Sequence, residues 1–236
     1  MAIYKGTYSE RYRRLTLHNH LCNFRCLGCT YKLKNAPNPE RFFEIPEIAK
    51  AIEGLEFDTV HFMGGEPTTN KGLPELLAFF KHSVGVRTAL GHTNGWNLVT
   101  KDLDATNVSI KFHDDNLARE YTGLPAGRVL GNFRAAYDAG LAMKASTVFI
   151  PGFGGLGDLE KIVRFVEGID RTISFHVMGY VPMPGAPWKR PTDAEMADAV
   201  ALASAHLDHV GFSHLTVEEL LNTESRDDRF VVRRVF

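Results

Sequence analysis

All three cysteines of the chain lie in one short stretch, Cys22 to Cys29, with the spacing C-x3-C-x2-C. Thiolates this close in sequence are expected to converge on one centre, and the chain has no further cysteine to serve as a fourth ligand. Soft thiolates select iron–sulfur clusters, zinc or copper(I). The spacing therefore predicts an iron–sulfur cluster, held by Cys22, Cys26 and Cys29, in which one iron stays open for a substrate or cofactor.

A zinc site is the alternative that this stretch leaves open. His20 lies two residues before Cys22, so a Cys3His ligand set is available. Structural zinc sites usually take ligand pairs from two separated knuckles, whereas these thiols share one short loop. The loop favours a cluster, and a non-catalytic zinc-binding module is the competing function from another class.

Strand and helix patterns alternate along the rest of the chain. Period-two alternation bounded by turn residues predicts six strands, and helical spacing of apolar residues predicts helices between them. The expected strands are 13–19, 58–63, 85–92, 106–112, 142–150 and 172–180. The expected helices are 45–55, 72–82, 131–139, 159–166 and 192–207, the last with Thr192 as its N-cap.

This alternation predicts an α/β fold with a parallel sheet and right-handed crossovers. Six units are fewer than the eight that close a barrel, so we expect a partial, open (β/α)6 barrel. A single domain is expected over residues 1–236, with a core at about 13–212 and a tail, 213–236, whose role the sequence leaves open.

Composition excludes several classes of protein. The net charge of −1 gives no broad field for nucleic acid or membranes, and an odd number of cysteines argues against a disulfide framework. The N-terminus has no apolar run typical of a signal peptide, and no stretch approaches the ~18 apolar residues of a membrane span. We expect a cytoplasmic protein.

The residues that could do chemistry follow the ends of the predicted strands. The cysteine stretch follows the first strand, Gly64-Gly65-Glu66 the second and Thr93-Asn94-Gly95 the third, while Lys111 lies near the end of the fourth. Because parallel α/β sheets bind ligands at the carboxyl ends of their strands, these features predict one site on one rim.

The combination of the cysteine spacing with Gly64-Gly65-Glu66-Pro67 resembles the radical S-adenosylmethionine (SAM) superfamily. The later segments 93–95, 108–111 and 148–152 are similar to the pyruvate formate-lyase activating enzyme branch, and the resemblance covers about 15–207. It implies a single radical SAM domain with a [4Fe-4S] cluster on the three cysteines and with SAM on the open iron.

The resemblance also implies roles for residues around the cofactor. Gly64 and Gly65 would let the backbone approach the methionyl amino group, Glu66 would orient their loop, and Lys111 would pair with the methionyl carboxylate. Gly28, Thr30, Asn94 and Ser109 would be further SAM contacts. No catalytic residue is expected beyond those that bind the cluster and SAM.

Several positions depart from the family pattern and leave the substrate open. Gly28 replaces the aromatic residue that usually covers the adenine, a role that Tyr31, Phe24 or the backbone of 28–30 could take instead. His92 replaces an acidic residue, and Val181 stands where the branch has a histidine. The Pro-rich loop 183–190 could clamp a substrate or simply connect two elements.

By resemblance, the protein is expected to be an anaerobic oxidoreductase of the activating-enzyme type. A low-potential donor, ferredoxin or flavodoxin, would reduce the cluster, and cleavage of SAM would give a 5′-deoxyadenosyl radical that abstracts hydrogen. The preferred substrate is a glycyl-radical enzyme. The alternatives are a small metabolite and a residue in a peptide or protein.

Overall fold

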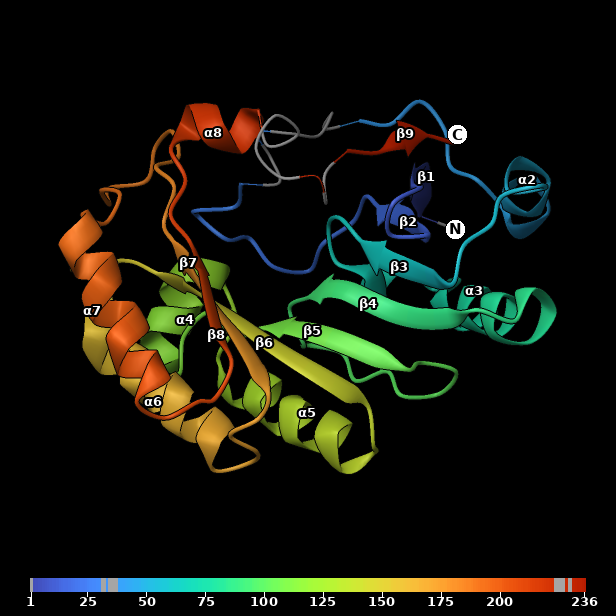
Figure 1. The fold of residues 1–236 in the computed structure, drawn as a ribbon. Helices are drawn as coiled ribbons and strands as arrows, with labels where there is room; N and C mark the ends of the chain where they lie inside the picture. Colours follow the sequence, from blue (N-terminus) through green and yellow to red (C-terminus); the bar gives the residue numbers. More distant parts are fainter. Residues whose placement is uncertain (1, 31–32, 34–37, 223–227, 229–230) are drawn as a thin grey trace.

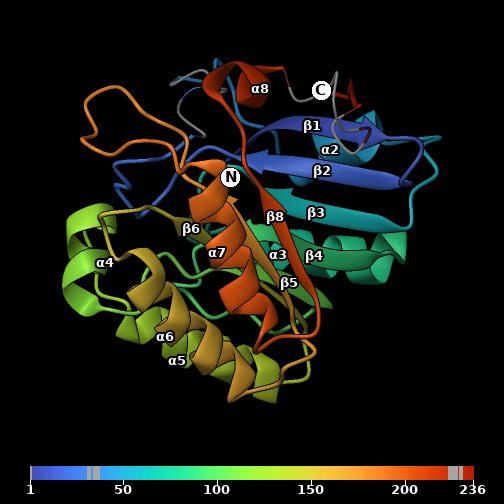
Figure 2. The ribbon, with the colours of Figure 1, turned by 60° about the vertical axis from the view of Figure 1, so that its left-hand side comes forward.

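The computed structural model describes residues 2–30, 33, 38–222, 228 and 231–236. It contains a curved nine-stranded sheet in the order β8-β7-β6-β5-β4-β3-β2-β1-β9, with helices packed against one of its faces (Figures 1 and 2). The strands are β1 Ile3–Ser9, β2 Arg14–Asn19, β3 Thr59–Met63, β4 Arg87–Thr93, β5 Ala105–Ser109, β6 Ala142–Phe149, β7 Ser174–Gly179, β8 Val210–Ser213 and β9 Arg233–Arg234.

Strands β2 to β8 run parallel to one another, which confirms the predicted α/β class with a mainly parallel sheet. The six predicted strands correspond to β2 through β7. Strand β1, which we did not predict, pairs antiparallel with β2, and β8 extends the parallel part at the other end. Sequence patterns missed these outer strands because β1 precedes the first recognised repeat and β8 is only four residues long.

The helices are α2 Ile45–Ala51, α3 Leu73–Ala78, α4 Asp115–Thr122, α5 Gly127–Asp138, α6 Gly155–Glu167, α7 Asp193–Ser204 and α8 Val217–Leu221. Helix α3 continues into a π-helical turn at Phe79–Val84, and Thr192 caps α7 as predicted, accepting a hydrogen bond from the Glu195 N–H. Two helices, α4 and α5, separate β5 from β6, whereas β4 runs to β5 through 94–104 without one. The described helices are all too short or too polar to cross a membrane.

The two faces of the sheet differ in chemistry because side chains alternate along each strand. Leu15, Leu17, Val60 and Phe62 are fully buried against α2 and α3, and Phe175 and Val177 are buried in the same way beside α6 and α7. The intervening residues of these strands, such as His61 and His176, face the opposite, concave side. The helices therefore cover an apolar face, and the concave face is polar.

The C-terminal segment, whose role the sequence left open, lies along the edge of β1. Strand β9 pairs with β1, the Val235 N–H donates to the Gly6 carbonyl at 2.8 Å, and the Phe236 ring lies 4.6 Å from that of Phe43. A paired strand protects the edge of a sheet from pairing with other chains. The segment thus completes the sheet on this side.

Candidate cluster and cofactor site

The turn after β3 lies directly against the start of the cysteine loop. Gly64 and Gly65 have φ values of 77° and 23°, a region that favours glycine. A Cβ added to Gly65 would lie 2.3 Å from the Leu21 carbonyl oxygen, and the Glu66 N–H donates to that same oxygen at 2.6 Å. The close approach explains why glycine stands at position 65.

The Glu66 carboxylate joins the ends of two strands. It is 1% exposed and accepts hydrogen bonds from the Thr68 N–H and hydroxyl, from the Thr93 hydroxyl at 2.7 Å and from the Asn94 N–H at 2.6 Å. Desolvation raises its pKa, and the hydrogen bonds oppose that rise. All the observed partners of this carboxylate are donors from the protein, so it holds the loops after β3 and β4 together.

Two asparagines connect the cysteine loop to these turns. The fully buried Asn19, at the end of β2, donates to the carbonyls of Leu21 and Glu66 at 2.8 Å each. The Asn94 side chain donates to Asn23 Oδ1 at 2.8 Å. The start of the cysteine loop is therefore fixed to both neighbouring strand ends by side-chain hydrogen bonds.

Helix α4 supports the middle of the cysteine loop. The N–H groups of Arg25 and Leu27 donate to the carbonyls of Thr122 and Tyr121 at 2.8 and 3.0 Å. The last carbonyls of a helix have no partner within it, so the loop satisfies them and is positioned in return. Asp114 caps the start of α4 by accepting hydrogen bonds from the N–H groups of Asn116 and Leu117.

The three thiols lie close enough to influence one another. Desolvation raises the pKa of Cys22 to about 11, and the charges of Glu66, Cys26 and Cys29 act in the same direction. Cys22 Sγ also accepts a hydrogen bond from the Phe24 N–H at 3.4 Å. Although the Cys22 residue is exposed at the surface, its thiol favours the protonated form until a metal displaces the proton.

The spacing of the possible metal ligands bears on the zinc alternative. Within the described part of the chain, no three His, Cys, Asp or Glu side chains are grouped tightly enough for one metal ion. A zinc ion with ~2.3 Å bonds to sulfur needs its thiolates in tight contact, whereas a four-iron cluster is larger and its ligands stand further apart. The three thiols and His20 are not grouped in this structure as the ligands of a bound zinc ion would be.

Close packing around Gly28 explains why this position has no side chain. A Cβ at this position would lie 2.4 Å from the Tyr121 hydroxyl and 2.7 Å from the Tyr180 ring, and both tyrosines are almost fully buried. Two tyrosines thus fill the space next to the loop, which explains the missing side chain.

Phe24 is buried in the core beside Trp96, and the suggested role of Tyr31 lies outside the described residues. Thr30 accepts a hydrogen bond from the Leu33 N–H.

Lys111, Ser109 and His92 lie together at the ends of β4 and β5. Lys111 Nζ donates to the buried Ser109 hydroxyl at 2.7 Å. Burial lowers the pKa of His92 to about 3, and the nearby charges of Lys111 and His176 lower it further. His92 is therefore neutral at physiological pH. This position lacks the negative charge that the acidic residue of the family pattern would supply.

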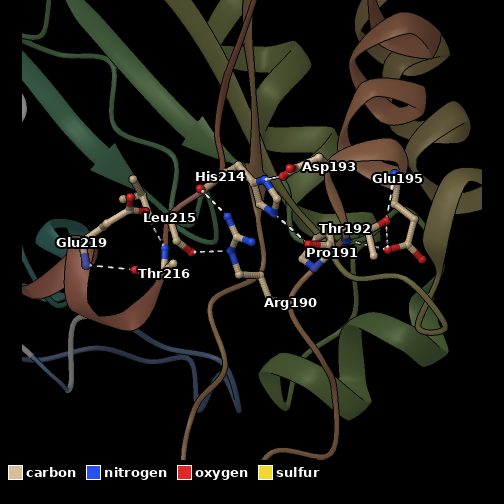
Figure 3. A network of polar contacts seen from close by, with 9 residues as sticks. All are labelled: Arg190, Pro191, Thr192, Asp193, Glu195, His214, Leu215, Thr216 and Glu219. Atoms are coloured by element: carbon tan, nitrogen blue, oxygen red, sulfur yellow. Dashed lines mark hydrogen bonds and ion pairs between the residues drawn. The ribbon is translucent and has the colours of Figure 1, made fainter.

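The Pro-rich loop 183–190 is anchored at its end. Arg190 donates to the carbonyls of His214 and Leu215 at 2.8 and 3.1 Å, and His214 Nε2 lies 2.7 Å from the Pro191 carbonyl oxygen (Figure 3). These contacts tie the loop to the segment that follows β8.

Val181, where a histidine was expected from the resemblance, is 6% exposed.

A model of the radical SAM superfamily matches residues 16–166. The chain belongs to the radical SAM superfamily. Its cofactors are those of the family, a [4Fe-4S] cluster and SAM. In radical SAM enzymes the cofactor carries the difficult chemistry, and the protein supplies binding and orientation.

Individual relatives differ in their named activities. A provisionally named glycyl-radical enzyme activating enzyme of Methanocaldococcus jannaschii is 26% identical over 85% of this chain and 80% of its own length. A GTP 3′,8-cyclase of Pectobacterium atrosepticum is 32% identical over 66% of this chain and 51% of its own. The structure of SuiB from Streptococcus suis bound to SAM has a TM-score of 0.64 at 18% identity, covering 84% of this chain and 48% of SuiB.

This radical SAM chain spans about half the length of the cyclase and of SuiB. The likeness to SuiB concerns the fold. Sequence reasoning missed the supporting residues Asn19, Asn23, Tyr121 and Tyr180. Asn19 carries a weak signal as a polar residue that ends a strand just before the cysteines, and the tyrosines carry none because they come from distant elements.

Proposed function

We propose that Cys22, Cys26 and Cys29 hold the cluster and that the adjoining strand ends bind SAM. The observation that carries this proposal is the buried Glu66 carboxylate, which joins the turn after β3 to the end of β4 beside the cysteine loop. The SAM-binding residues in this proposal are Gly28, Thr30, Gly64, Gly65, Glu66, Asn94, Ser109 and Lys111.

When bound at the reduced cluster, SAM supplies a 5′-deoxyadenosyl radical that removes a hydrogen atom from a substrate. The backbone at Gly64 and Gly65 carries no side chains and would bind the methionyl amino group. Lys111, which donates to Ser109, would pair its ammonium with the methionyl carboxylate. Glu66 and Asn94 keep these loops in register with the cysteines.

Two substrate classes fit this chemistry. Activation of a glycyl-radical enzyme is supported by the name of the Methanocaldococcus relative, which this chain matches over most of its length. A small-molecule substrate is supported by the polar concave face and by the cyclase relatives. Ferredoxin or flavodoxin as electron donor, and a cytoplasmic location, belong to the same proposal.

The test is reductive cleavage of SAM after anaerobic reconstitution of the cluster. Wild-type protein should form 5′-deoxyadenosine, and Cys22→Ala, Cys26→Ala and Cys29→Ala should lose both iron and product. Lys111→Ala should keep the cluster and bind SAM about tenfold more weakly, as expected for a lost charge-assisted contact, whereas Lys101→Ala should not. A colourless protein without product would contradict the proposal.

A second measurement distinguishes the two substrate classes. An activase should give a glycyl-radical signal in electron paramagnetic resonance when it is mixed with a partner enzyme. An enzyme that acts on a small molecule should instead transfer deuterium from a labelled metabolite to 5′-deoxyadenosine. Absence of the first signal together with presence of the second would reject the activase role.

A further inference from the structure

Tyr121, near the end of α4, contacts the cysteine loop at two consecutive residues. Its backbone carbonyl accepts the Leu27 N–H at 3.0 Å. Its hydroxyl lies beside Gly28, so close that a Cβ on that residue would be 2.4 Å from the hydroxyl oxygen. Both contacts fall between Cys26 and Cys29, which are two of the three cluster ligands in the proposed function.

The side chain of Tyr121 is held in this place by a packed aromatic cluster. The tyrosine is 2% exposed. The same buried cluster contains Phe112, Phe153 and Tyr180. The rings of Phe112 and Trp188 lie 5.3 and 5.6 Å from the Tyr121 ring. Trp188 comes from the Pro-rich loop, so that loop contributes to the burial of the tyrosine.

A sulfur ligand lies against the same aromatic cluster. Cys26 is half-buried and packs against it. A tyrosine is protonated at physiological pH because its ordinary pKa is ~10. Desolvation raises the pKa of Tyr121 further, and the charges of Cys26 and Cys29 act in the same direction. The cysteine loop therefore has a buried O–H donor beside it.

The second tyrosine beside Gly28 is placed differently. Tyr180 approaches Gly28 with its ring, which would lie 2.7 Å from the added Cβ. Its hydroxyl accepts the Met183 N–H at 3.2 Å and so contacts the chain that follows β7. Of the two tyrosines, Tyr121 presents its hydroxyl to the cysteine loop, and Tyr180 presents its ring.

We propose that the Tyr121 hydroxyl donates a hydrogen bond to a sulfur of the bound cluster, on the side of Cys26 and Cys29, and thereby raises the reduction potential of the cluster. Hydrogen bonds to its sulfurs are among the factors that set the potential of an iron–sulfur cluster. A donor favours the reduced state because that state carries one more negative charge. Burial strengthens the effect, since little water competes for the sulfur.

The step affected is the one-electron reduction of the cluster by the low-potential donor, in which no covalent bond forms or breaks. The inference rests on the proposed function, in which the three cysteines hold the cluster. It adds a residue of α4 to the groups that determine how readily the cluster is reduced.

The test is a redox titration of the anaerobically reconstituted full chain without SAM, followed by electron paramagnetic resonance. Tyr121→Phe keeps the ring and its packing, so its iron content should match that of the wild type. Its potential should fall by ~59 mV, which corresponds to a tenfold smaller equilibrium constant for one-electron reduction. The matched control Tyr180→Phe removes a hydroxyl from the same aromatic cluster and should keep the wild-type potential.

Electron–nuclear double resonance identifies the donor directly. The reduced wild-type cluster should couple to a proton that exchanges in D₂O, and this coupling should be absent in Tyr121→Phe and present in Tyr180→Phe. If Tyr121→Phe fails to retain a cluster, replacement of Tyr121 by a ring-fluorinated tyrosine decides the question. Fluorination keeps the ring and strengthens the donor, so the potential should rise.

Equal potentials of the wild type and Tyr121→Phe would overturn the inference, and so would a potential that fluorination leaves unchanged. A Tyr121→Phe protein that cleaves SAM at an unchanged potential would remove the role of the hydroxyl and leave the proposed function standing. A wild-type protein that forms a cluster but cleaves no SAM under dithionite would reject the proposed function. The titration would still decide the role of Tyr121 in that case.

Discussion

The Glu66 carboxylate accepts the Asn94 N–H at 2.6 Å, and through this contact the turn after β3 is held to the end of β4. A carboxylate is well suited to this place because its observed partners are all donors. Asn94 in turn donates to Asn23 in the cysteine loop. One buried anion thereby organises three loops of the site.

Replacement of Glu66 by glutamine should break this arrangement. The amide nitrogen of Gln cannot accept from the Asn94 N–H or from the threonines, so one buried donor loses its partner. We expect a loss of about 2 kcal/mol in the free energy of unfolding together with weaker SAM binding. Denaturant unfolding and calorimetry measure both quantities, and the exposed Glu75→Gln on α3 is the control. Equal stability of both variants would refute the importance of this carboxylate.

Gly65→Ala should be more damaging than a helical glycine substitution. The new Cβ would lie 2.3 Å from the Leu21 carbonyl oxygen, which is backbone and cannot move without shifting the cysteine loop. We expect lower cluster content and a loss of about 3 kcal/mol or more in stability. Gly131→Ala in α5 meets no atom within 4 Å and should stabilise the protein by ~0.5–1 kcal/mol. Iron analysis and thermal unfolding compare the two.

Gly28→Ala should disturb the cysteine loop through Tyr121. The added methyl group would collide with the Tyr121 hydroxyl, and removal of that hydroxyl relieves the closest contact. We therefore expect Gly28→Ala to lower iron content severalfold and the double variant Gly28→Ala/Tyr121→Phe to recover part of it. Tyr121→Phe alone is the control for the hydroxyl itself. Strict additivity of the two changes would show that these residues do not interact.

Stability should fall on mild acidification because of the concave-face histidines. Unfolded His61 takes up a proton near pH ~6.5, but in the folded protein burial lowers its pKa to about 4. Its contribution is therefore present above the unfolded pKa and is lost as the pH falls towards the folded value. Between about pH 7.5 and about pH 5.5 this amounts to about 1 kcal/mol.

The variant His61→Gln should show a shallower dependence of the unfolding free energy on pH over this range. The exposed His209→Gln is the matched control and should keep the slope of the wild type. Denaturant titrations at several pH values measure the slopes. The same slope for His61→Gln and wild type would contradict the lowered pKa.

The sequence was most informative where local pattern determines structure. Alternating apolar residues predicted strands such as 58–63, observed as Thr59–Met63, and the choice of Thr192 as a cap was confirmed because its capping box lies within four residues. Such signals need no knowledge of tertiary contacts.

Features that depend on distant contacts could not be predicted in this way. The absence of a side chain at Gly28 follows from Tyr121 and Tyr180, which approach it from other elements. Helix α4, which Asp114 caps, was not predicted from the sequence.

The bonds from Arg25 and Leu27 to the carbonyls at the end of α4 also constrain how the protein matures. A ribosome delivers the cysteines long before it delivers Tyr121 and Thr122. Until α4 has emerged and packed, the cysteine loop lacks the partners that set its backbone. Cluster insertion into the final geometry must therefore follow the synthesis of at least the first half of the chain, which makes iron content a measure of how far that half has folded.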